Sequence, residues 1–504
     1  MSQQSIVLFN PCTEREKRPS QWAPLSLLAL GSVLDERGYN VVIMDEKMEE
    51  DATKNVLDIA PEALFLGITS MTGPQIRNGI HIAKKVREVH SKLPIIWGGW
   101  HPTLCSDSTI ASLNVDVVVR GQGQETIIEV AERLKAYQTL EGVLGVSYKE
   151  NGHIVHNPPR PFKDPNHFKR LAYHLLDLKK YQSAQPRDVG PKNLPSFFGQ
   201  AKGINYIASY GCPYKCAFCS LYNVYHQRYY PLSPSRVVED LEYLVNEGFN
   251  LITFEDNLFF MNQSWVGEIC EGIIERQLDL KWYAAGRAPD LTRFGENLLD
   301  SIRRSGCLYV LIGAESGSQD VLELIDKKAK PSDTEKAVDR LAQHGITACL
   351  TYMVGVPGES QESHWETFEQ MGRIKAHHEN TSVTLCVYTP YPGTLLFDRA
   401  LASGFQEPTT MESWSKISHS TSQLPSLSSK SLHRIRIFKN FYLRYAYPTS
   451  SLKKRMRSSV TFFVLHRLTL MRLKRRWLSF QWEFWIFRLR KSLLSAFGRL
   501  LTRH

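Results

Sequence analysis

The sequence predicts an α/β protein in which two alternating strand–helix regions precede a basic helical region. Short apolar runs alternate with amphipathic stretches over the first 140 residues and again from residue 205 to residue 387, a pattern typical of parallel sheets covered by helices. Beyond Met411 the alternation stops, and Ser, Thr, basic and aromatic residues dominate. The length of 504 residues is enough for about three domains. We therefore expect a two-domain α/β body with a helical C-terminal extension.

Residues 1–145 are expected to form a flavodoxin-like or Rossmann-like domain, because five apolar runs have the length of buried strands. The runs are Ile6–Phe9, Val41–Met44, Leu64–Ile68, Ile95–Trp97 and Val117–Val119, and the candidate helices are Leu25–Arg37, Thr72–Val89 and Glu125–Ala136. Such sheets bind ligands in loops beyond the carboxyl ends of their strands. These loops are small and polar here, with candidate binding residues Thr69, Ser70, Gly98, Gly99, His101, Gly121 and Gly123. The turns of any flavodoxin-like domain also need Gly and Thr, so the loops alone leave both interpretations open.

A hairpin and a connector are expected over residues 146–202. The segment Tyr148–Val155 contains Asn151-Gly152, a dipeptide that favours the tight turn matching strand twist. A connector containing Pro, Asn and Lys follows from Pro158 to Lys202.

Residues 203–410 are expected to form an open, six-stranded relative of the eight-fold (β/α) barrel. The strand candidates are Asn205–Ala208, Leu251–Phe254, Trp282–Ala285, Tyr309–Ile312, Cys349–Val354 and Val383–Val387, and the helical patterns are Pro234–Glu247, Trp265–Gln277, Gly295–Ser305, Ser332–His344 and Glu362–Ile374. In barrels of this kind the chemistry takes place at the carboxyl ends of the strands. We therefore expect the functional residues just after each strand.

Three cysteines, Cys212, Cys216 and Cys219, follow the first barrel strand. Three thiolates on one loop can converge on a soft metal centre. A structural zinc site normally has four ligands, and no nearby Cys or His makes a convincing fourth. Three ligands suit a 4Fe–4S cluster with one open iron, whereas electron-transfer clusters normally have four cysteines. The six other cysteines are scattered, and we expect them to be small buried hydrophobic residues.

This C-x3-C-x2-C spacing, with Phe218 just before the last cysteine, resembles the radical S-adenosylmethionine (radical SAM) superfamily over residues 203–404. The resemblance implies a 4Fe–4S cluster whose open iron binds S-adenosylmethionine, which one electron cleaves to methionine and a 5′-deoxyadenosyl radical. It also implies that this cosubstrate contacts Phe218, Glu255, Asp256, Arg287, Glu315, Ser316 and Val356. Glu359 and Asp320 are expected to be helix N-caps or solvated loop ends instead.

In front of such a barrel, the first domain resembles the cobalamin-binding branch of that superfamily. The matching loops are Gly67-Ile68-Thr69-Ser70, Gly98-Gly99-x-His101-Pro102-Thr103 and Gly121-Gln122-Gly123-Gln124, although acids are more usual where the glutamines stand. The resemblance implies that these loops line a corrin pocket. The chain has no Asp-x-His-x-x-Gly motif, so His101 is expected to line the pocket, with cobalt ligation as the less favoured alternative. A degenerate domain that kept the fold and lost the corrin is also an alternative.

Residues 411–504 hold the net positive charge of the chain. From Ser451 to His504 there are fourteen Lys and Arg residues against one acid, Glu483, whereas the rest of the chain is nearly neutral. Leu, Phe and Trp recur among these basic residues at helical spacing, without the ~20 uncharged apolar residues that span a bilayer. Basic amphipathic helices rich in Trp and Phe favour contact with a membrane surface. A helical cap over the barrel opening is one alternative, and nucleic-acid binding is a less favoured one.

These observations lead to one main hypothesis for the function. The resemblance implies a cobalamin-dependent radical SAM methyltransferase that acts on an unactivated carbon of an apolar or lipid-like small molecule, with electrons from flavodoxin or ferredoxin. An oxidative cyclase or ring-rearranging enzyme of the same branch is the alternative, and a non-catalytic corrin or S-adenosylmethionine sensor is a remote one. A methylthiotransferase is less expected, because the first domain has no second cysteine triad. With no visible secretory signal, we expect a cytoplasmic protein, peripheral at the inner face of the membrane if the tail binds there.

Overall fold

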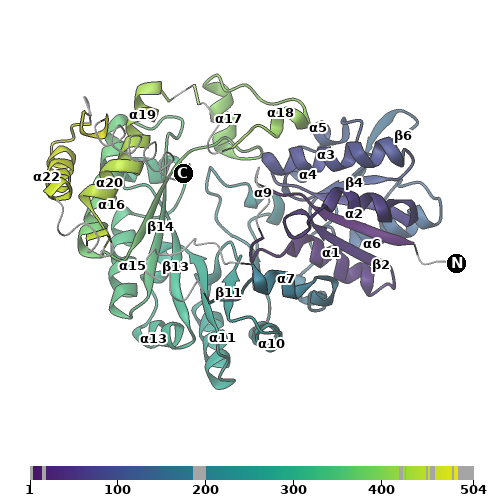
Figure 1. Cartoon of the computed structure of the whole chain (residues 1–504), viewed down its shortest axis with the longest axis horizontal. Helices are drawn as coiled ribbons and strands as arrows, with labels where there is room; N and C mark the ends of the chain where they lie inside the picture. Colours follow the sequence, from purple (N-terminus) through teal and green to yellow (C-terminus); the bar gives the residue numbers. More distant parts are fainter. Residues whose placement is uncertain are drawn as a thin grey trace, which may run out of the picture.

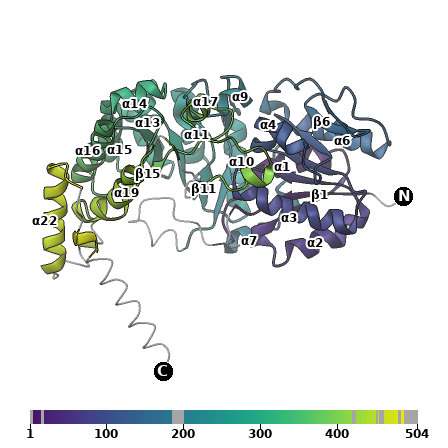
Figure 2. The ribbon, with the colours of Figure 1, turned by 90° about the horizontal axis from the view of Figure 1, so that it is seen from above.

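The computed structural model describes residues 4–13, 19–184, 200–418, 424–425, 427–449, 452–453, 460–478 and 482–485. Two α/β units lie side by side along the longest axis of the molecule (Figure 1). Of the C-terminal region, α18 (Met411–Trp414) packs against α3 (Pro74–Val89) of the first unit, whereas α22 (Val460–Lys474) lies beyond the second unit, at the opposite end from the first (Figure 2). None of the described helices combines the length and the apolar character that crossing a membrane requires.

The first unit is built on one seven-stranded sheet with the order β2-β1-β3-β4-β5-β6-β7. The first five strands are parallel in the flavodoxin-like order 2-1-3-4-5, which confirms the predicted fold class. The hairpin β6–β7 adds to β5 in antiparallel pairing, so it extends this sheet although the sequence analysis placed it with the connector. The strands are β1 (Ser5–Asn10), β2 (Asn40–Asp45), β3 (Ala63–Thr69), β4 (Ile95–Gly98), β5 (Val117–Val119), β6 (Val146–Glu150) and β7 (His153–His156).

Helices cover both faces of this sheet. Ile6 of β1 packs toward α1 and α6, whereas its neighbour Val7 packs toward α2 and α3, because successive strand residues point to opposite faces. Helix α2 was not predicted from the sequence; it begins where the Asp51 side chain accepts a hydrogen bond from the Lys54 backbone N–H. The helices are α1 (Leu25–Asp35), α2 (Ala52–Ile59), α3 (Pro74–Val89), α4 (Trp100–Leu104), α5 (Ser106–Ile110) and α6 (Gln124–Lys135).

The second unit is an open barrel of six parallel strands in the order β15-β14-β13-β12-β11-β8, as predicted. Every predicted strand is present. The strands are β8 (Gly203–Tyr206), β11 (Leu251–Phe254), β12 (Lys281–Gly286), β13 (Cys307–Glu315), β14 (Thr347–Val354) and β15 (Ser382–Val387). The outer helices are α10 (Pro234–Asn246), α11 (Gln263–Glu275), α13 (Glu296–Arg304), α15 (Pro331–Gln343) and α16 (Gln361–His377).

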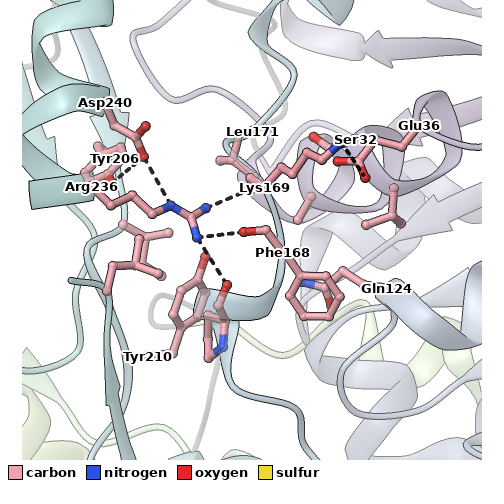
Figure 3. A pocket seen from close by; sticks show the side chains of 15 residues that line it. Ser32, Glu36, Gln124, Phe168, Lys169, Leu171, Tyr206, Tyr210, Arg236 and Asp240 are labelled. Atoms are coloured by element: carbon pink, nitrogen blue, oxygen red, sulfur yellow. Dashed lines mark hydrogen bonds and ion pairs between the residues drawn. The ribbon is translucent and has the colours of Figure 1, made fainter.

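The connector after the hairpin joins the two units. Arg236 of α10 donates hydrogen bonds to the connector carbonyls of Phe168, at 2.7 Å, and Lys169, at 2.8 Å (Figure 3). On the same helix Asp240 accepts from the Tyr206 hydroxyl, at 2.8 Å, and pairs with Arg170. These bonds fix the connector on the barrel.

The described residues from Leu427 onward pack on the barrel. Phe438 stacks on Phe368 of α16 with ring centroids 3.7 Å apart. Leu427 lies over the carboxyl end of β14, beside Gly355. These residues therefore pack against α16 and the end of β14, and a cap over the barrel opening stays a prediction. The elements are α19 (Ser429–Ile437), a π-helical turn η6 (Phe438–Tyr442), α20 (Leu443–Ala446) and α22 (Val460–Lys474).

Candidate active site

The three cysteines lie on a loop at the carboxyl end of the barrel, here called the cysteine loop (residues 212–219). A short strand, β9 (Ser209–Gly211), leads into it and pairs with β10 (Tyr229–Pro231). Gly211 has a φ of +80°, and a Cβ there would lie 2.3 Å from the Arg228 carbonyl oxygen, so the turn requires glycine. The Ala217 N–H donates to the Ile325 carbonyl at 2.8 Å, which ties the loop to the barrel.

Burial and mutual repulsion shape the chemistry of the three thiols. Burial raises the pKa of Cys212 and Cys216, and it raises the pKa of Cys219 to about 11, with the two neighbouring thiols adding to the effect. The positive charge of Lys327 lowers the pKa of all three. Thiols that raise one another's pKa lie close enough for their charges to interact, as ligands of one metal centre must.

The donor set fits a multinuclear cluster better than a single ion. Among the described residues, no group of three or more His, Cys, Asp and Glu side chains is placed to hold one metal ion. In an iron–sulfur cube each cysteine binds a different iron, so the thiols stand further apart than around zinc. A 4Fe–4S cluster held by Cys212, Cys216 and Cys219 stays a prediction.

Lys327 stands beside the cysteine loop, and the sequence analysis missed it. Its side chain is 9% exposed, and its Nζ lies 3.0 Å from Glu315 Oε1 and 5.6 Å from the centroid of the Phe218 ring. Glu315 has a φ of +62°, a strained conformation for a residue with a side chain. In the sequence, Lys327 lies between the charged residues Asp326 and Lys328, a pattern that predicts a solvent-exposed side chain. Only the fold shows that it is buried.

Arg287, a predicted S-adenosylmethionine contact, uses part of its guanidinium group for contacts within the protein. Its guanidinium donates to the backbone carbonyls of Lys327 and Lys328 and stacks over the Tyr214 ring at 3.4 Å from the centroid. Its Nε is buried and has no hydrogen-bond partner among the described residues. An unpaired buried donor beside the cysteine loop is costly unless a ligand accepts from it. This atom fits the predicted role.

Three other predicted contacts hold the loops in place. Asp256 accepts from the Ala208 N–H at 3.0 Å and from the Ser209 hydroxyl at 2.5 Å, just before the cysteine loop. The Ser316 hydroxyl bonds the Thr367 hydroxyl of α16 at 3.0 Å. Val356 is buried in the apolar cluster that also contains Ala217. Their side chains position the site, and a direct contact with a cosubstrate stays a prediction for each.

Asp256 gives a testable pH dependence. Burial raises the pKa of Asp256 to about 7, although its hydrogen bonds lower it. The folded chain thus keeps a proton that the unfolded chain loses above about pH 4. Stability should therefore fall as the pH rises from about 4 to 7, and level off above. In Asp256→Asn the amide oxygen can accept from the Ala208 N–H and the NH2 group can donate to the Ser209 hydroxyl. The amide cannot ionise, so the variant should melt a few degrees above the unmodified chain at pH 8 but not at pH 4.

Differential scanning fluorimetry across this pH range measures the effect. Asp320→Asn, which changes an exposed carboxyl at the start of α14 (Gln319–Leu324), is the control and should leave the pH dependence as it is. An Asp256→Asn variant that melts lower at every pH would contradict the prediction.

A cavity of about 580 Å³ lies between the two units. Its lining includes the predicted loop residues Thr69, Ser70, Gly98, Gly99, Gly121 and Gly123, together with Gln122 and Gln124. At Gly99, where φ is +97°, a Cβ would lie 2.7 Å from the Thr69 hydroxyl, so glycine lets the two loops meet. The Ser70 hydroxyl is buried without a partner among the described residues. A deep cradle with an unpaired hydroxyl is what a large bound ligand would fill.

His101 does not line this cavity, contrary to the expectation. Its ring is fully buried, 3.1 Å from the Thr72 hydroxyl through Nδ1 and edge-on to Trp414 at 5.5 Å between ring centroids. Burial lowers the pKa of His101 to about 4, so the ring is neutral. Two other residues of helix α4, Trp100 and Thr103, line the cavity. Neither was predicted from the sequence.

Glu255 lies where the cavity meets the barrel. It follows β11 directly and lines the cavity. The surrounding protein raises the pKa of its carboxyl to about 7, against the lowering effect of Lys47. Lys47 comes from the first unit and lines the same cavity. Tyr210, two residues before Cys212, also lines it. The cavity of the first unit therefore reaches the strand that carries the cysteine loop.

Comparisons with known proteins agree with this division of the chain. Residues 206–371 match the model of the radical SAM superfamily, and residues 15–131 match the B12 binding domain. An uncharacterized methyltransferase of Pyrococcus horikoshii is 30% identical over 88% of this chain and 94% of its own length. An anaerobic magnesium-protoporphyrin IX monomethyl ester cyclase of Synechocystis is 26% identical over 66% of this chain and 64% of its own.

A solved structure has the same fold. The radical S-adenosylmethionine methyltransferase TsrM from Kitasatospora setae, with cobalamin and a [4Fe–4S] cluster bound, superposes with a TM-score of 0.64 over 80% of this chain and 75% of its own, at 18% identity.

Proposed function

Because the chain belongs to the radical SAM superfamily and carries a B12-binding domain, we propose that it is a cobalamin-dependent radical SAM enzyme that methylates an unactivated carbon of an apolar or lipid-like small molecule. One observation carries the proposal. The cavity lined by Thr69, Gly98 and Gly121 of the first unit is also lined by Tyr210 and Glu255 of the barrel, next to the cysteine loop. A methyl donor bound in that cavity would face the place where a substrate radical forms.

The residues present fit both groups. The cysteine loop would hold a 4Fe–4S cluster, and the glycine-lined cavity would hold the corrin. When bound, these groups supply a radical that removes hydrogen from carbon and a methyl group that replaces it. The buried Nε of Arg287 can donate a hydrogen bond to the carboxylate of the cosubstrate. Guanidinium groups commonly pair with carboxylates through such charge-assisted hydrogen bonds. The Glu315–Lys327 pair, 3.0 Å apart, fixes the loop after β13 beside the thiols.

The surroundings of the thiols limit side reactions. Ala217, Val356, Tyr388 and Leu396 form a buried apolar cluster against which Phe218 packs. An apolar wall keeps water away from a radical site. The proposal also takes in flavodoxin or ferredoxin as the electron donor and contact of the C-terminal region with the inner face of a membrane.

Labelled S-adenosylmethionine tests methyl transfer. We expect the reconstituted chain, reduced without oxygen, to place label from the S-methyl group in its product and to release both 5′-deoxyadenosine and S-adenosylhomocysteine. A screen of apolar candidates in extracts of the host supplies substrates. Product without label, formed by a chain that holds both cofactors, would contradict methylation.

The cyclase relative supports one other candidate function. Its 26% identity extends over 66% of this chain. An oxidative cyclase or ring-rearranging enzyme would form 5′-deoxyadenosine without S-adenosylhomocysteine. The same assay therefore separates the two activities, and a chain that forms neither compound would favour the remote alternative of a sensor.

A further inference from the structure

We propose that helix α22 (Val460–Lys474) and the tryptophans that follow it form a docking surface for an anionic membrane. This inference rests on the membrane contact included in the proposed function and does not depend on the proposed methyl transfer. We call this the α22 surface, formed by the exposed residues Val460, Phe463, Val464, Arg467, Lys474, Arg475, Trp477, Trp482 and Trp485.

The exposed positions of α22 follow one face of the helix. Val460, Phe463, Val464 and Arg467 are spaced by three and four residues, which places them in one stripe. The three apolar side chains are 79%, 59% and 54% exposed. Most exposed apolar side chains on a protein are isolated, so a contiguous stripe indicates a contact surface.

The opposite face of α22 packs against the rest of the protein. Leu465 and Leu473 join the barrel core, and the buried Arg472 pairs with Glu483 at 2.6 Å. Arg476, just after the helix, pairs with Glu369 of α16 at 2.7 Å and with Glu362. These contacts fix the helix on the barrel, so that its apolar stripe faces outward.

The charge of the α22 surface selects an anionic partner. Over residues 460–478 and 482–485 the only acid is Glu483, which is buried in its pair with Arg472, whereas Arg467, Lys474 and Arg475 are exposed. Basic side chains beside apolar and Trp side chains match a lipid interface, where headgroups are charged and the layer beneath is apolar. Nucleic acid would attract the same basic side chains through its phosphates, but its phosphate backbone would not bind the exposed apolar side chains between Val460 and Val464.

The position of this surface in the molecule agrees with such a role. In both views α22 lies at the edge of the second unit, at the end opposite the first unit (Figure 1, Figure 2). Docking through α22 would place the barrel at the lipid surface and leave the first unit away from it. A lipid-like substrate would then have a short path to the barrel.

Vesicle co-sedimentation of the full chain tests the proposal. We expect binding to vesicles of phosphatidylcholine with roughly 30 mol % phosphatidylglycerol, and little binding to phosphatidylcholine alone or at high salt. Phe463→Ser/Val464→Ser should weaken binding several-fold, and Lys474→Glu/Arg475→Glu at least about tenfold. Leu113→Ser, at an apolar residue of the first unit that is 89% exposed, and Arg304→Glu, at an exposed residue of α13, are the matched controls.

Two results would overturn the proposal. One is vesicle binding that both double variants leave unchanged. The other is an absence of vesicle binding. If the chain is then retained on duplex DNA, the basic surface binds nucleic acid instead. Circular dichroism of each variant shows whether the fold is kept, which separates a lost surface from an unfolded chain.

Discussion

Changing Cys216 to alanine is expected to abolish the reductive cleavage of S-adenosylmethionine, by roughly three orders of magnitude or more. Cys216 is 8% exposed at the centre of the cysteine loop. Its loss leaves two thiolates for a cluster that needs three. The measurements are the iron content after anaerobic reconstitution and the 5′-deoxyadenosine formed with dithionite.

Cys105→Ala is the matched control for this change. Cys105 is a partly buried thiol of the first unit, remote from the cysteine loop in sequence, and its loss should leave iron content and cleavage as they are. An unchanged iron content in Cys216→Ala would contradict the assignment of the cluster to this loop. Equal losses in both variants would instead indicate a general effect of removing a thiol.

Filling the cavity between the two units should remove cobalamin binding without touching the cluster. Gly98 ends β4 and lines the cavity, and a Cβ added there would make only ordinary contacts, 3.6 Å from the Val119 carbonyl oxygen. Gly98→Phe would extend a ring into the space that the corrin needs. We expect the affinity for cobalamin to fall by about tenfold to a hundredfold, measured by titration of the cobalamin absorbance.

Gly98→Ala is the control, because its methyl group fits beside Val119. It should bind cobalamin like the unmodified chain. Both variants should keep their iron and still form 5′-deoxyadenosine, since the cysteine loop is untouched. Unchanged cobalamin binding by Gly98→Phe would place the corrin elsewhere or show that the chain does not bind it.

The regular elements were predictable because they depend on local patterns. Apolar runs of strand length alternate with helical spacing, and this alternation alone placed the strands of both parallel sheets. The hairpin was also visible in Asn151-Gly152, but its pairing with β5 was not, since strand pairing joins residues far apart in the chain. Helix α2 is eight residues long, too short for a clear period.

In the candidate site, too, the sequence predicted which residues follow each strand but not where their side chains point. Glu255 and Asp256 are neighbours with the same chemistry, yet Glu255 faces the cavity and Asp256 bonds Ala208 and Ser209 behind the cysteine loop. His101 follows the double glycine as expected, yet its ring turns toward Trp414. Just after a strand or at the start of a short helix, side-chain direction depends on the packing of distant segments, which a residue pattern does not contain.

By itself the sequence determined the two-unit fold and the cysteine loop, because strand alternation and three cysteines in C-x3-C-x2-C spacing are properties of short segments. Only the tertiary structure decided that Lys327 is buried beside the thiols and that the cavity of the first unit extends to Tyr210. It also decided which face of α22 remains exposed. These facts arise where separate elements meet, and the free energy of burial that fixes them is shared among residues far apart in the chain.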